Sequence, residues 1–141
     1  MRKSNSFVAA TIAVAALWSG GAPAQSTQLV VELNKLESIE NGCRTFFLFR
    51  NQTAMTFQAF EMSLAVFDQQ GVIDRLLTVE ASPLPAGRTT LKLFEIPDMQ
   101  CDGVGEILLH EIAKCEPDRG EAVDCFAIID LQSRAAATLV K

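Results

Sequence analysis

Apolar residues recur at every second position through most of the chain after residue 28, and this spacing predicts β-strands. In the first such stretch, Leu29, Val31 and Leu33 share one parity, which is typical of a half-buried strand. Helical periodicity is weak throughout. We expect strands at seven places, namely residues 29–34, 43–49, 57–67, 72–79, 89–94, 104–113 and 125–131.

Turn signals separate these stretches. Asp68-Gln69-Gln70-Gly71 predicts a hairpin turn, and two prolines interrupt the chain between Ser82 and Gly87. A loop is expected around Glu37, Glu40 and Asn41-Gly42, and a plain turn at Asn51-Gln52-Thr53, although that triplet also matches an N-glycosylation motif. We expect the residues after Ser133 to form a mobile tail.

The run at residues 107–114 has fair helix propensity, so a helix remains an alternative there. Gly103 and Gly105 precede it and no N-cap residue does, which favours a strand. About seven short strands then predict an all-β fold, an Ig-like antiparallel β-sandwich.

The first 24 residues have the pattern of a Sec-type signal peptide. Arg2 and Lys3 precede an apolar stretch at residues 7–18, which is too short to span a bilayer. Small residues at Ala22 and Ala24 predict cleavage between Ala24 and Gln25; an N-terminal membrane anchor is the alternative. We therefore expect a cleaved signal peptide at residues 1–24, a single sandwich domain at 25–141 without a membrane span, and a periplasmic location.

The four cysteines predict disulfides in that oxidising compartment. No two of them are spaced as C-x-x-C, so neither a thioredoxin-type motif nor a zinc knuckle is indicated. Four cysteines allow three pairings. The polar turn between Cys115 and Cys125 favours joining these two, which leaves Cys43 to pair with Cys101.

Charge and composition exclude several functions. The chain of 141 residues has a net charge of −5, and removal of Arg2 and Lys3 makes the remainder still more acidic. Nucleic-acid binding is therefore not expected, because it requires a basic surface. An apolar fraction of 49% is sufficient for a folded core.

A search for catalytic groups finds little. His110 is the single histidine, and no G-x-S-x-G motif surrounds a serine. Asp98, Asp102 and Glu106 are spaced by four residues but lack the calcium-loop pattern. We expect a protein that is not an enzyme and uses no cofactor or metal.

Binding of a protein partner is the remaining function class. The segment before Pro97 carries basic and apolar residues that are conspicuous in an acidic chain, which makes it a candidate partner surface formed by Arg88, Lys92, Leu93 and Phe94. The simpler interpretation is an ordinary edge strand protected by Lys92. A small secreted hydrolase, or an enzyme inhibitor acting through a loop, is the alternative function.

The order of motifs resembles a family of small periplasmic proteins of alphaproteobacteria, labelled "Tat pathway signal sequence domain protein". The resemblance runs from Leu33-Asn34-Lys35-Leu36-Glu37 through Leu84-Pro85-Ala86-Gly87 to Cys101-Asp102-Gly103-Val104-Gly105. It implies a partner in the cell envelope, since members are often encoded near ExbB/ExbD-type energy-transducing components. The chain departs from the label because no Arg-Arg pair precedes its apolar core. More loosely, the chain is similar to Ig-like FxLyD-type extracellular domains.

Overall fold

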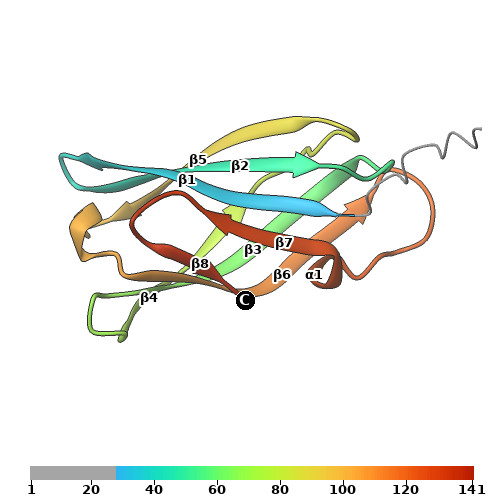
Figure 1. Ribbon diagram of the computed structural model, residues 1–141. Coiled ribbons are helices and arrows are strands. Elements are labelled where there is room, and N and C mark those ends of the chain that lie inside the picture. The colour runs from blue at the N-terminus through green and yellow to red at the C-terminus, as the bar shows by residue number, and fades with distance from the viewer. Residues whose placement is uncertain (1–27) are drawn as a thin grey trace, which may run out of the picture.

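Two four-stranded β-sheets pack face to face in the computed structural model, which describes residues 28–141 (Figure 1). One sheet has the strand order β5-β2-β1-β7 and the other has the order β4-β3-β6-β8. The predicted all-β sandwich is confirmed, with eight strands. The predicted signal peptide at residues 1–24 lies outside the described residues.

The elements follow the chain in a simple order. The strands are β1 (Leu29–Ile39), β2 (Gly42–Asn51), β3 (Phe57–Phe67), β4 (Ile73–Glu80), β5 (Thr89–Pro97), β6 (Glu106–Pro117), β7 (Ile129–Ser133) and β8 (Thr138–Val140). Two short helical turns interrupt them, η1 (Cys101–Gly103) and α1 (Cys125–Ile128). Within residues 28–141, no helix is long and apolar enough to cross a bilayer.

The core lies between the sheets and is built from alternate strand positions. Phe47 and Phe49 of β2 and Phe60 of β3 are at most 1% exposed, and the rings of Phe49 and Phe60 lie 6.1 Å apart, nearly perpendicular to each other. The strand interpretation of residues 107–114 is also confirmed, since Ile107 and Leu109 of β6 are buried in the same core. Period-two spacing in the sequence therefore marked the inward faces correctly.

The predicted loop at Glu37 is wrong, because β1 continues to Ile39 in register with β2. The register shifts between Leu33 and Lys35, and this irregularity changes which side chains point outward. The turn that follows brings Gly42 against β5. A Cβ atom on Gly42 would lie 2.3 Å from the Ile96 carbonyl oxygen, so the close approach of the two strands requires glycine there.

The C-terminal part differs most from expectation. Residues 125–128 form α1 instead of strand, because the Asp124 side chain accepts a hydrogen bond from the Ala127 amide and caps the turn. The predicted mobile tail is wrong as well, since β8 pairs with β6 and Leu139 is buried. Burial of this apolar side chain explains why the segment is ordered.

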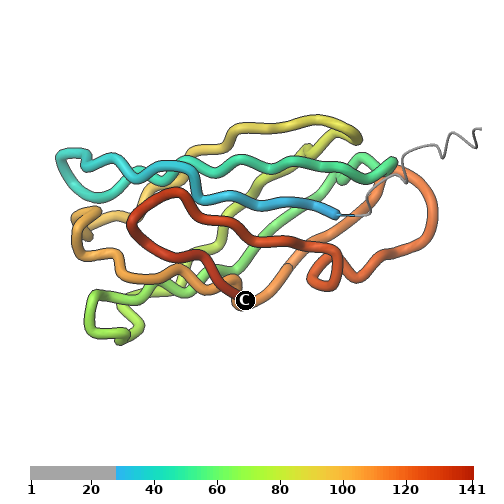
Figure 2. The backbone as a smooth tube through the Cα atoms, in the orientation of Figure 1, coloured from blue at the N-terminus to red at the C-terminus, as the bar shows by residue number. Residues whose placement is uncertain are grey.

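Two of the six strand pairings are parallel, which the expected antiparallel sandwich did not include. β7 runs parallel to β1 in one sheet, and β8 runs parallel to β6 in the other. The tube in Figure 2 shows the segment from β7 to β8 passing from one sheet to the other and closing one side of the sandwich. The opposite side is bordered by the edge strands β5 and β4.

Candidate protein-binding surface

Strand β5 is an edge strand that pairs with β2 alone. Its side chains alternate, so Leu91 and Leu93 point away from the core while Ile96, of opposite parity, is buried. The register places Leu91 opposite Leu48 and Leu93 opposite Phe46 on β2. Two pairs of apolar side chains therefore meet on the outer face of the β5-β2-β1-β7 sheet.

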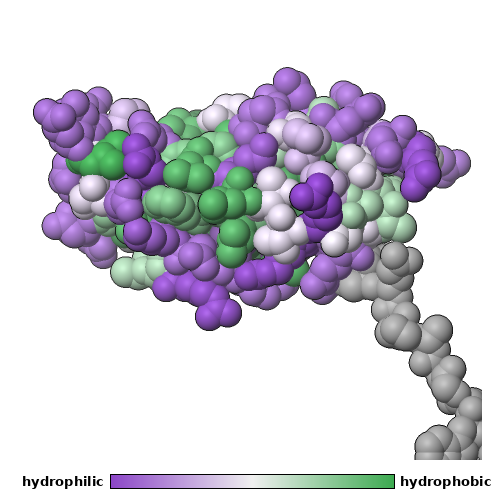
Figure 3. Space-filling model, turned by 90° about the horizontal axis from the view of Figure 1, so that it is seen from above, coloured by the Kyte–Doolittle hydropathy of each residue, from purple (hydrophilic) through white to green (hydrophobic). Residues whose placement is uncertain are grey.

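We call these four residues, Phe46, Leu48, Leu91 and Leu93, the outer patch. Leu91 is 52% exposed and Leu93 is 47% exposed, whereas the two β2 residues are half-buried. Figure 3 views the molecule from above this sheet and shows apolar surface in the middle of the face with polar surface around it. A contiguous apolar surface with a polar rim is the usual anatomy of an interaction site.

The rim of the outer patch consists of ion pairs between side chains. Arg44 contacts Glu95 at 3.0 Å, and Lys35 contacts Glu37 at 2.7 Å while its ammonium lies 5.1 Å from the centre of the Phe46 ring. The pKa of Glu37 is lowered by its hydrogen bond from Lys35 and by the charge of that lysine. These pairs hold long side chains at the border of the patch and leave the leucines uncovered.

The residues predicted to form a partner surface do not all point the same way. Leu93 belongs to the outer patch, but Phe94 points inward, where its ring lies 5.8 Å from that of Phe47. Lys92 has the same parity as Phe94, and its ammonium donates a hydrogen bond to the Ser82 carbonyl at 2.8 Å. Arg88 is exposed immediately before β5. The four predicted residues therefore divide between two faces of the sheet, and of these four only Leu93 belongs to the outer patch.

Three residues of the outer patch, Phe46, Leu48 and Leu91, were missed by sequence reasoning. The strand at residues 43–49 carries apolar residues on both faces, a pattern typical of a strand buried on both sides, so it did not indicate which face is exposed. Leu91 shares the parity of Leu93, and this signal could have indicated it. The pairing of β5 with β2 could not be read from the sequence, because 37 residues lie between the two strands.

Arg88 and Lys92 share an electrostatic property. Within residues 28–141, neither has a carboxylate oxygen within 4.0 Å, which is also true of Arg119 and Lys141. The other basic residues in this range all have one, namely Lys35, Arg44, Arg50, Arg75, Lys114 and Arg134. Lys92 is half-buried at the side of the sandwich bordered by β5 and β4. The edge at β5 therefore presents positive charge without a counterion in an otherwise acidic protein.

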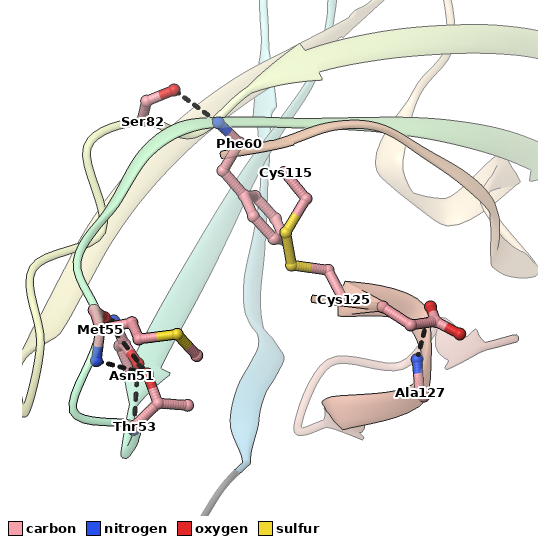
Figure 4. Close-up of a disulfide and its surroundings, with 9 residues drawn as sticks. Asn51, Thr53, Met55, Phe60, Ser82, Cys115, Cys125 and Ala127 are labelled. Atoms are coloured by element: carbon pink, nitrogen blue, oxygen red, sulfur yellow. Dashed lines mark hydrogen bonds between the residues drawn. A yellow bond between two sulfur atoms is a disulfide. The ribbon is translucent and has the colours of Figure 1, made fainter. Parts of the chain in front are cut away.

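Asn51 fixes the chain segment that leads into β5. Its buried side-chain amide donates hydrogen bonds to the Met55 and Leu84 carbonyls at 2.7 and 2.9 Å. Its Oδ1 atom accepts hydrogen bonds from the amide and hydroxyl of Thr53, as Figure 4 shows. The glycosylation-like triplet is thus a structural turn whose asparagine is only 2% exposed.

Both disulfides have the predicted pairing. Cys43 of β2 is joined to Cys101 of η1, and Cys115 of β6 is joined to Cys125 of α1 (Figure 4). The first bond connects β2 to the segment that follows β5, and the second holds α1 against β6. Two disulfides fit an oxidising compartment outside the cytoplasm.

A hollow of about 420 Å³ contains His110, Glu111 and Asp124 beside the second disulfide. His110 is exposed, and its imidazole makes no hydrogen bond or ion pair with any of residues 28–141. Neither a hydroxyl side chain nor a free thiol of the described residues lines this hollow. The residues that line this hollow therefore do not support the alternative function of a small secreted hydrolase.

The part of the chain that the structure describes also contains no group of three or more His, Cys, Asp or Glu side chains that could hold a metal ion.

The sequence matches no protein-family model, and its comparison with curated proteins and with solved structures gives no match.

Proposed function

We propose that this protein is an exported, periplasmic accessory module that is not an enzyme and binds a protein partner through the outer patch. The observation that carries this proposal is the position of Leu91 and Leu93 on the outer face of an edge strand, each about half exposed. Two leucines in that position leave apolar area in contact with water, and a protein partner would remove it.

Four further features support the proposal. The apolar N-terminal sequence is typical of a signal peptide, and both disulfides suit the oxidising periplasm. The rim of ion pairs around the patch corresponds to the polar border of known interfaces. The resemblance to alphaproteobacterial periplasmic proteins supports a partner in an envelope energy-transduction or transport complex of the ExbB/ExbD type.

The test compares two variants in which exposed leucines are replaced by serine. In Leu91→Ser/Leu93→Ser the outer patch loses both exposed leucines. In the control Leu76→Ser a leucine is removed from β4 on the other sheet, where it is 64% exposed and thus more exposed than either leucine of the patch. Each purified protein is immobilised and exposed to envelope extract from the source cell. The captured proteins are quantified by mass spectrometry.

We expect the wild-type protein and the control to retain the same inner-membrane component. The double variant should retain at least about tenfold less, because a few buried apolar anchors carry most of the binding energy in protein interfaces. Thermal unfolding of all three proteins verifies that they are folded. Equal capture by the double variant would overturn the outer patch as the binding surface.

A further inference from the structure

The backbone of β5 has hydrogen-bonding groups at its open edge, and their positions follow from the register. The Asn51 amide donates to the Arg88 carbonyl at 2.9 Å, which makes these two residues a hydrogen-bonded pair. In an antiparallel ladder such pairs recur at every second residue. Thr90, Lys92 and Phe94 therefore direct their backbone groups toward β2. The backbone groups that point to the open edge belong to Thr89, Leu91, Leu93 and Glu95.

Leu91 and Leu93 thus present both their side chains and their backbone groups to a partner at the edge of the sheet. Their side chains form half of the outer patch, and their backbone groups face the open edge. An extended segment that paired with β5 would satisfy these groups, and its alternate side chains would lie beside the two leucines. Apolar residues at those alternate positions would extend the patch by one strand.

The remaining side chains of such a segment would lie on the inward side, next to Lys92. Lys92 is half-buried, and its ammonium donates one hydrogen bond, to the Ser82 carbonyl. Covering it further without a counterion is unfavourable, because a charge that leaves water needs an opposite charge. An acidic residue in the added segment would supply that charge, and Arg88 offers a second positive group at the start of β5.

The same lysine argues against a second copy of this chain as the occupant. Antiparallel pairing of two β5 strands would bring one Lys92 close to the other, and a charged residue that points inward on an edge strand is a known device against such pairing. The charge of the edge therefore favours a different, acidic partner.

We propose that the open edge of β5 binds an extended protein segment in which apolar and acidic residues alternate. The segment adds as a fifth strand to the β5-β2-β1-β7 sheet, with its apolar side chains beside Leu91 and Leu93 and an acidic side chain near Lys92. This proposal rests on the proposed protein-binding function and specifies how the partner is recognised.

The first test uses two synthetic peptides of seven residues with blocked ends, one alternating valine with aspartate and one alternating valine with lysine. Fluorescence anisotropy measures the binding of each labelled peptide to residues 25–141. The aspartate peptide should bind at least about tenfold more tightly than the lysine peptide, and Lys92→Glu should reverse this preference. Equal affinities, an unchanged preference in Lys92→Glu, or no binding of the aspartate peptide would each overturn the proposal.

The second test examines the backbone. Binding of the aspartate peptide should slow the hydrogen exchange of the Leu91 and Leu93 amides at least about tenfold, because these amides become hydrogen-bonded. The variant Thr89→Pro removes an edge amide that β2 does not use and should weaken peptide binding. Its far-ultraviolet circular dichroism verifies the fold. Unchanged exchange at Leu91 and Leu93 in the bound state would exclude strand addition.

The two proposals can fail separately. If Leu91→Ser/Leu93→Ser loses the envelope partner while exchange at the β5 amides is unaffected by that partner, the partner binds the outer face and only strand addition fails. If the envelope partner is retained by the double variant, the outer patch itself is excluded as the binding surface.

Discussion

The Glu32 carboxylate is buried on the outward-facing side of β1 and accepts a hydrogen bond from the Arg50 guanidinium at 2.8 Å. Asn34 donates a second hydrogen bond at 2.7 Å, and the Arg134 guanidinium lies 3.3 Å away. Side chains of β1, of β2 and of the residue after β7 thus surround one buried carboxylate. The arrangement connects β1, β2 and the residue that follows β7 beside the outer patch.

This network predicts a loss of stability in acid. The hydrogen bond from Asn34 lowers the pKa of Glu32, burial opposes that effect, and Arg50 lowers the pKa further. Since the folded-state pKa lies below the usual 4.5, the stabilisation is complete above that pH and is lost as the pH falls through the folded-state value. Glu32→Gln should lower the free energy of unfolding at pH 7 by about 1–3 kcal/mol.

Urea unfolding at pH 7 and at pH 3 measures this effect. The difference between wild type and Glu32→Gln should be smaller at pH 3 than at pH 7, because the stabilisation that the lowered pKa of Glu32 provides is lost as the pH falls from the unfolded-state value through the folded-state value. The pKa of Glu80 on the other sheet is also lowered, because Ser82 donates hydrogen bonds to its carboxylate. The stabilisation that Glu80 provides should therefore decrease in acid in the same way. A difference between the two proteins that stayed constant with pH would contradict this role of Glu32.

The hydrogen bonds of the Asn51 amide predict that Asn51→Asp reduces stability at least as much as Asn51→Ala. Asn51→Ala removes two donors and leaves the Met55 and Leu84 carbonyls without them, which should reduce stability by about 2–4 kcal/mol. Asn51→Asp has nearly the same shape but turns a negative oxygen toward those carbonyls, so it should be at least as destabilising. Chemical denaturation measures both, with the exposed neighbour variant Gln52→Ala as the control. A mild effect of Asn51→Asp would show that the amide donors are unimportant.

The two disulfides predict unequal losses of stability. The Cys43–Cys101 bond closes 58 residues and the Cys115–Cys125 bond closes 10. Loop entropy then gives about 4 kcal/mol for the first bond and about 3 kcal/mol for the second. Paired Cys→Ala variants of each bond, compared by denaturant unfolding, test this order. A larger loss from the short loop would mean that local contacts of α1 outweigh chain entropy.

The strand pattern was the most predictable part of the fold. Period-two spacing located β3 at its observed bounds and indicated the buried parity of Phe60 and Ile107. Such positions can be recognised in the sequence because burial of one face of a sheet requires apolar residues at every second position of each strand. Both disulfide pairings were predicted for a similar reason, since the polar turn between Cys115 and Cys125 is a local feature.

The C-terminal elements were not predictable in the same way. β8 has three residues and pairs with β6 across 30 or more positions, so no local pattern distinguishes it from a tail. α1 depends on one capping side chain, Asp124. The outer patch was only partly predicted because its residues come together through the register of β2 and β5, which a single strand does not encode.

The passage of the chain from β7 to β8 has a consequence for how the protein folds. The first strand, β1, has its parallel neighbour in β7, where Leu29 pairs with Ile129, and the other sheet receives its last strand from Thr138–Val140. Neither sheet is complete before these two strands join it. Closure of the sandwich therefore depends on pairings between residues that are distant in the chain, and such pairings slow folding relative to a sheet made of hairpins alone.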